Sequence, residues 1–236
     1  MTSLSREHQP TPTGKEPATV WLRRLHSVSG VLPLGAFLVL HLWVNARAMQ
    51  GELRYDAVVR KIQSIPGLVV LEVCGLGLPL LFHAGYGIWT MRRPSSEVRR
   101  SSYEAPWAAA LQRAAGLVTL AFLAVHVATL RLRVALGTLG PSDLYSTLTD
   151  SIGATTSLGL PFLAVFYLVG LGGASYHLAT GLVGFSLTWG LAPTERAHRL
   201  WRLGSSAVGL ALFLLGARTI VYFATGAVPS FGVRTP

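Results

Sequence analysis

The chain has 236 residues, of which 51% are hydrophobic and 13% charged, and its mean hydropathy is +0.48. Soluble domains carry about 25% charged residues, so this composition excludes a disordered chain and favours a protein that lies in a lipid bilayer. The single cysteine, Cys74, excludes an intrachain disulfide. The formal net charge of +10 reflects an excess of Lys and Arg. In a membrane protein, this excess is explained first by the basic residues that set topology and only second by nucleic-acid binding, so we expect no nucleic-acid partner.

The apolar stretches predict the elements in chain order. Residues 1–20 are polar, lack the apolar core of a signal peptide, and are expected to form an N-terminal tail. A bilayer-spanning helix needs about 20 residues. We therefore expect an all-α integral membrane bundle of five transmembrane helices, forming one domain over residues 21–236. The apolar stretches are 28–46, 67–91, 112–130, 158–191 and 203–227.

Basic residues are divided unevenly between the two sides of this bundle. The side that holds the N-terminus and the second and fourth connections carries more Lys and Arg than the other side. The positive-inside rule places the more basic side in the cytoplasm. We expect a cytoplasmic N-terminus, an external C-terminus and a location in the cytoplasmic membrane of a bacterium, in contact with lipid.

Histidines lie inside each of the first four predicted helices, at His41, His83, His126 and His177. A lone histidine in an apolar helix is usually a packing residue, but polar groups at membrane depth are costly and tend to be functional. Each of the four lies past the middle of its helix, roughly 4–8 Å beyond the midplane at about 1.5 Å per residue. Because successive helices run in opposite directions, His41 and His126 fall in the outer half, and His83 and His177 in the inner half.

Two histidines at one depth, on different helices, are typical of a haem clamped between two imidazoles. Iron with two such ligands has no open coordination position, which favours electron transfer over oxygen binding. The pattern predicts two haem b groups roughly 10 Å apart, with the four histidines as axial iron ligands. The other ring nitrogen of each ligand needs a partner, often a carbonyl one turn away. Nearby glycines, among them Gly30 and Gly116, leave room for a haem or serve close helix packing.

Polar residues near the two haem depths are candidate contacts for the propionate groups, which need cations or hydrogen-bond donors. For any single cation, its position is explained equally well by contact with a lipid phosphate or by the positive-inside rule alone. The candidates are Arg24, His26, Ser27 and Arg113 for the inner haem, and Arg47 and Arg131 for the outer haem.

Glu72 is the only carboxylate inside a predicted helix and lies near the outer face. It is the candidate catalytic residue, as a proton carrier for a quinone, with a role in helix packing as the alternative. Arg218 lies in the fifth helix, where its candidate partners are Glu72, a propionate or a lipid phosphate. His198 is expected in a solvated basic loop.

Several segments resemble one known family. They read RRLHS at 23–27, LPLLFHAGYG at 78–87, and LQR with GLVT at 111–113 and 116–119, followed by the segments around His126 and His177. The chain resembles the di-haem cytochrome b membrane subunit of type B succinate:quinone oxidoreductase, the Bacillus-like succinate dehydrogenase form. The resemblance runs from about Trp21 to Phe223.

The resemblance implies that the chain is the membrane subunit of an oxidoreductase. It would anchor a flavoprotein subunit, which carries FAD, and an iron–sulfur subunit, and these partners would oxidise succinate at the cytoplasmic face. Electrons would pass from the iron–sulfur clusters to the inner haem of His83 and His177, then to the outer haem of His41 and His126. A quinone near the outer face, usually menaquinone in this family, would be the acceptor.

Other functions share parts of this pattern. A di-haem anchor of a quinol:fumarate reductase or of another membrane dehydrogenase would have the same ligands and different partner subunits. A histidine-relay transporter would bind no haem, and it needs a more continuous polar path than Glu72 and Arg218 provide. A purely structural anchor leaves the four histidines unexplained.

Overall fold

The computed structural model describes residues 18–92, 106–156, 159 and 161–227, and within these ranges every regular element is a helix. Most of the predicted polar tail lies outside the described residues. In the described ranges, five helices are long and apolar enough to cross a membrane, which confirms the predicted all-α bundle. They cover Ala18–Gln50, Leu68–Met91, Trp107–Ala135, Phe162–Thr188 and Glu195–Thr225.

The first three spans each contain a wider π-helical segment. The first span runs through α1 (Ala18–Ser29), η1 (Gly30–Gly35), α2 (Ala36–Asn45) and η2 (Ala46–Gln50). The second comprises α4 (Leu68–Glu72), η3 (Val73–Gly77) and α5 (Leu78–Met91), and the third α6 (Pro106–His126), η4 (Val127–Arg131) and α7 (Leu132–Ala135). Pro33 lies inside η1 and Pro79 follows η3. Because proline has no N–H, the helix ladder loses a bond there, and a π segment is one way to accommodate the loss.

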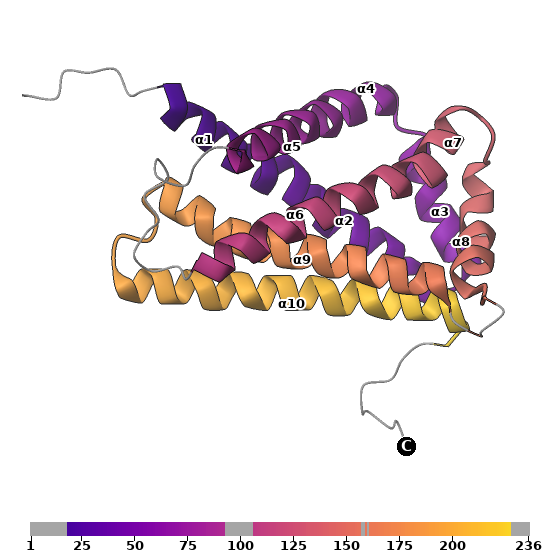
Figure 1. Cartoon of the computed structure of the whole chain (residues 1–236). Coiled ribbons are helices and arrows are strands. Elements are labelled where there is room, and N and C mark those ends of the chain that lie inside the picture. Colours follow the sequence, from indigo (N-terminus) through magenta and orange to yellow (C-terminus); the bar gives the residue numbers. More distant parts are fainter. Residues whose placement is uncertain (1–17, 93–105, 157–158, 160, 228–236) are drawn as a thin grey trace, which may run out of the picture.

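The last two spans are the uninterrupted helices α9 (Phe162–Thr188) and α10 (Glu195–Thr225). They lie side by side along their length, α6 also packs on α9, and α1 contacts both α9 and α5 (Figure 1). A Cβ atom at Gly209 would lie 2.7 Å from the Ala179 side chain, and one at Gly216 would lie 2.7 Å from Leu171. Glycine at these contacts lets the two backbones approach, as is usual between helices in membranes.

Short helices cover one end of the bundle. They are α3 (Glu52–Gln63) and α8 (Leu144–Gly153), the latter preceded by η5 (Pro141–Asp143), and they pack on each other and near the end of α10. Tyr55, Val59, Leu148 and Ile152 are buried there. We call α3 and α8 the cap, this end of the bundle the cap end, and the opposite end, where α1 begins, the N-terminal end (Figure 1).

Helix boundaries differ from those that hydropathy predicts. The first span begins at Ala18 rather than near residue 28, and the fifth at Glu195 rather than near residue 203. The added turns contain Arg, which is a good helix former but lowers the hydropathy of a window. At the fifth span the helix start is also fixed by Thr194, whose hydroxyl accepts a hydrogen bond from the Ala197 N–H at 3.2 Å.

Candidate functional site

At the N-terminal end of the bundle, the imidazoles of His83 on α5 and His177 on α9 face each other. Their ring centroids are 6.0 Å apart and the planes are perpendicular, at 88°. Each Nδ1 lies 3.0 Å from a main-chain carbonyl on a neighbouring helix, that of His26 for His83 and that of Gln112 for His177. An Nδ1–H that donates to a carbonyl leaves the lone pair of a neutral imidazole on Nε2. Both Nε2 atoms are therefore available as metal ligands.

Glycines provide the space for these two rings. A Cβ at Gly30 would overlap the imidazole of His83, and a Cβ at Gly116 would lie 2.8 Å from Cε1 of His177. The His83 ring also stacks against His26, with centroids 4.1 Å apart and an interplanar angle of 10°. The position and plane of His83 are thus set by a carbonyl, a glycine and an aromatic ring together.

At the cap end, His41 on α2 and His126 on α6 form the corresponding pair. Their centroids are 5.6 Å apart and the planes meet at 89°. Nδ1 of His126 lies 3.1 Å from the hydroxyl of Tyr167. Nε2 of His41 lies 3.3 Å from the side-chain nitrogen of Asn45, one helical turn further along. In this pair, side chains rather than carbonyls hold the rings.

The geometry of both pairs fits a haem iron held between two imidazoles. A metal-bound imidazole nitrogen lies about 2.0–2.1 Å from the ion, so rings on opposite sides of one ion have centroids about 6 Å apart. Within the described ranges, no group of three or more His, Cys, Asp or Glu residues could hold a metal ion by itself. Two imidazoles per site match haem iron, because the porphyrin supplies the remaining ligands. The fit is closer at His83 and His177, since His41 has an amide beside its Nε2.

Of the polar candidates at the N-terminal end, Arg24, His26 and Ser27 lie on α1, and Arg113 lies on α6. The Arg24 guanidinium lies over the rings of Trp21 and Trp189, at 5.2 and 5.7 Å from their centroids. The indole N–H of Trp189 donates to the Ser27 hydroxyl at 3.1 Å. Arg113 is exposed on α6. Nδ1 of His26 is buried, and none of the described residues offers it a hydrogen bond.

The polar candidates at the cap end have other partners in the structure. The Arg47 guanidinium lies 4.1 Å from the ring centroid of Trp43. Arg131 binds both carboxylate oxygens of Glu72, with its Nε at 3.0 and 2.9 Å. Each side chain of this ion pair is less than a third exposed. The partner of Glu72 is therefore Arg131 rather than Arg218.

The structure corrects the expectation for His198 and adds residues that the sequence did not single out. His198 is only 4% exposed, because α10 already begins at Glu195 and places this side chain inside the bundle rather than in a solvated loop. Tyr167, Asn45 and the Gln112 carbonyl were not predicted as partners of the histidines. Asn45 could have been found from the sequence, because a residue four positions after His41 lies beside it on the same helix. No sequence signal identifies Tyr167 or the Gln112 carbonyl, because they lie on other helices than the histidines they contact.

Imidazoles facing each other at both ends of a five-span helical bundle define the class of multi-pass membrane cytochromes b. The sequence profile of the succinate dehydrogenase/fumarate reductase transmembrane subunit family matches residues 5–93. The succinate dehydrogenase cytochrome b558 subunit of Bacillus subtilis (strain 168) is 32% identical over 203 residues, which cover 86% of this chain and 96% of that protein. No solved structure gives a significant match.

The chain therefore belongs to this family, as a membrane-anchor cytochrome b subunit of succinate dehydrogenase in the bacterial cytoplasmic membrane. The resemblance seen in the sequence is confirmed. Membership also implies partner catalytic subunits and a quinone.

Proposed function

We propose that the chain binds two b-type haems, one between His83 and His177 and one between His41 and His126. It would thereby connect the catalytic subunits of succinate dehydrogenase with menaquinone. Haem iron with two imidazole ligands supplies one-electron transfer when bound and has no open position for oxygen. The observation that carries the proposal is the pair of facing rings near each end of the bundle, with centroids 6.0 and 5.6 Å apart.

Surrounding residues support these ligand roles. A carbonyl or hydroxyl on Nδ1 fixes the tautomer and the plane of a ligating imidazole and raises its basicity. His83, His177 and His126 each have such a partner. The proposed propionate contacts are Arg24, His26, Ser27 and Arg113 at the N-terminal end, and Arg47 and Arg131 at the cap end.

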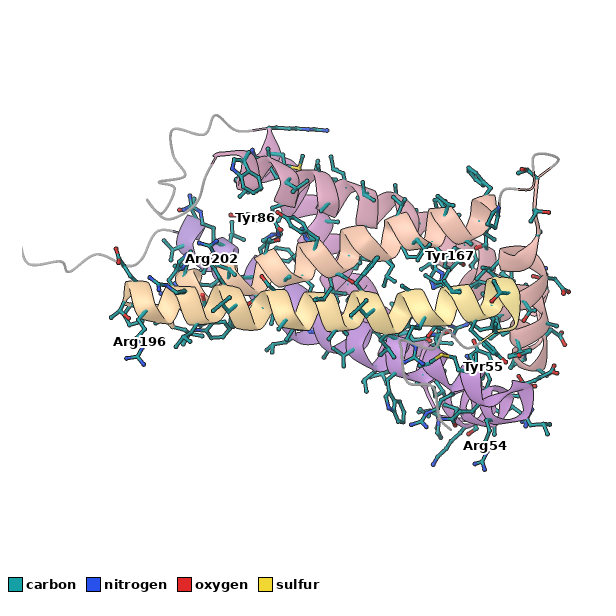
Figure 2. All side chains as sticks on the ribbon, turned by 90° about the horizontal axis from the view of Figure 1, so that it is seen from below. Arg54, Tyr55, Tyr86, Tyr167, Arg196 and Arg202 are labelled. Carbon is teal, nitrogen blue, oxygen red and sulfur yellow. The ribbon has the colours of Figure 1, made fainter. Side chains whose placement is uncertain are left out.

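The N-terminal end is proposed to face the cytoplasm and to bind a flavoprotein subunit with FAD and an iron–sulfur subunit. Tyr86, Arg196 and Arg202 lie toward this end, and Tyr55 and Tyr167 toward the other (Figure 2). The excess of Lys and Arg on the side of the N-terminus supports this orientation.

Glu72 is proposed to carry a proton for menaquinone at the cap end. Reduction of menaquinone to menaquinol takes up two electrons and two protons, and a carboxylate at the membrane edge can deliver one of them. The ion pair with Arg131 supports this role, because a charged carboxylate within a span needs a partner.

A haem count on the purified complex tests the proposal. We expect two b-type haems per chain in the reduced-minus-oxidised spectrum, together with co-purifying flavoprotein and iron–sulfur subunits. Replacing His83 with Ala should remove one haem and leave the other detectable, and His126→Ala should remove the other one. One haem or none in the wild-type complex contradicts the proposal, and the absence of haem absorbance would favour a histidine-relay transporter.

A further inference from the structure

A chain of hydrogen bonds joins the cap to His41. The side-chain nitrogen of Asn45 donates to the His41 carbonyl at 2.8 Å and lies 3.3 Å from Nε2 of the same histidine. The Asn45 side-chain oxygen accepts a hydrogen bond from the Tyr55 hydroxyl at 3.3 Å. Tyr55 belongs to α3 in the cap, so the contact connects a short helix outside the spans with a proposed haem ligand.

Both ends of this connection are fixed. With its oxygen bonded to Tyr55 and one N–H bonded to the His41 carbonyl, the Asn45 amide has its second N–H directed at the imidazole. Tyr55 is only 4% exposed, and its ring packs against Tyr145 and Phe223 with centroids 5.9 and 6.1 Å away. The hydroxyl therefore has little freedom to leave the amide.

Tyr55 acts only as a hydrogen-bond donor to this amide under ordinary conditions. Burial raises the pKa of the Tyr55 hydroxyl above its usual range, and the nearby Asp56 and Tyr167 raise it further. The phenol thus keeps its proton at neutral pH and donates to the Asn45 oxygen. A phenolate in its place would turn the amide around, because an amide N–H and not the oxygen would then face Tyr55.

We infer that Asn45, oriented by Tyr55, positions His41, so that the cap sets the ligand properties of the cap-end site. This inference rests on the proposed haem binding at His41. An amide N–H beside a ligating nitrogen competes with the iron for its lone pair, so the direction of the amide changes the strength of the iron–imidazole bond. The partners of His83 and His177 are main-chain carbonyls, so nothing in the cap acts on that pair in the same way.

The test is a redox titration of the b-haem absorbance in the intact complex, with Tyr55→Phe and Asn45→Leu compared with the wild type. The cap-end haem is identified as the one that His126→Ala removes. We expect its midpoint potential to shift in both variants, more in Asn45→Leu, while the potential of the other haem stays unchanged. Selective loss of the cap-end haem in Asn45→Leu supports the inference in the same way.

Tyr145→Phe is the matched control. Tyr145 lies in the cap and packs on Tyr55, but its hydroxyl lies 3.0 Å from that of Tyr222 instead of reaching Asn45. It should leave both potentials unchanged. An equal shift in Tyr145→Phe, or no shift in Tyr55→Phe, would overturn the inference. Fewer than two haems in the wild-type complex would instead contradict the proposed function, before any variant is compared.

Discussion

The two histidine pairs have similar ring spacing but are held by different parts of the chain. His83 and His177 use carbonyls of the main chain, and glycines on neighbouring helices leave room for their rings. His126 and His41 instead have the side chains of Tyr167 and Asn45 beside them. A carbonyl in a helix stays in place whatever side chain its residue carries. The N-terminal-end pair should therefore respond to changes in helix packing, and the cap-end pair to changes in side-chain chemistry.

The largest effect is expected from Gly30→Ala. The added methyl group would overlap the His83 ring and displace it, so the N-terminal-end haem should be lost and the cap-end haem retained. Overpacking of this kind also costs about 1–3 kcal/mol of stability. Haem per chain and the reduced spectrum are the measurements. Gly85→Ala, where a Cβ would meet nothing within 4 Å, should keep both haems. Unchanged haem content in Gly30→Ala would break the comparison.

Tyr167→Phe should weaken only the cap-end site. It removes the hydroxyl 3.1 Å from Nδ1 of His126 and leaves the ring shape intact. Loss of such a partner typically lowers affinity for the bound group about 10- to 100-fold. The rate of haem transfer to apomyoglobin, followed separately for the two haems, measures the change. Tyr222→Phe removes a hydroxyl that bonds Tyr145 instead and should have no such effect. Equal release of both haems from Tyr167→Phe would contradict the assignment.

Glu72→Gln separates quinone chemistry from haem binding at the cap end. The substitution removes the carboxylate charge that pairs with Arg131, so menaquinone reduction should fall several-fold while both haem spectra stay unchanged. Electron transfer from succinate to a soluble dye, measured in the same preparation, should be unaffected. Arg60→Gln is the control, because it breaks a different ion pair at this end, with Asp56 at 3.6 Å. Full quinone activity in Glu72→Gln would exclude Glu72 as the proton carrier.

The smallest effect concerns the cap alone. The hydrogen bond to Tyr222 is the main cause that raises the pKa of Tyr145 to about 12, with burial adding to it. Because the folded pKa is above that of the unfolded chain, this stabilisation is complete below about pH 10 and is lost as the pH rises toward 12. Tyr222→Phe should return the pKa of Tyr145 toward 10, as measured by NMR of labelled tyrosine. An unchanged pKa would show that the hydroxyl pair does not form.

The five spans and the grouping of the histidines by depth were predictable from the sequence. Hydropathy locates the spans because the bilayer demands about 20 apolar residues each time the chain crosses it. The helices alternate in direction, so a histidine late in each helix returns to the same level two helices later, and His41 meets His126 while His83 meets His177. The cap was missed because α3 and α8, of 12 and 10 residues, are short and amphipathic, with little effect on hydropathy.

The partners of the four histidines were not predictable in the same way. The carbonyls beside Nδ1 of His83 and His177 come from α1 and α6 rather than from one turn away on the same helix. Which carbonyl lies nearest depends on how two helices rotate about their axes. The π segments in the first span and elsewhere change that rotation, and hydropathy carries no information about it.

The sequence alone determined the number of spans and which apolar stretch forms each of them, since burying apolar side chains in lipid depends on composition and length. Only the tertiary structure decided that Glu72 pairs with Arg131, that Asn45 joins His41 to Tyr55, and that His198 is buried. Hydrogen bonds and ion pairs act over about 3 Å and in fixed directions. They therefore depend on the relative rotation and spacing of helices, which are set by packing between segments far apart in the chain.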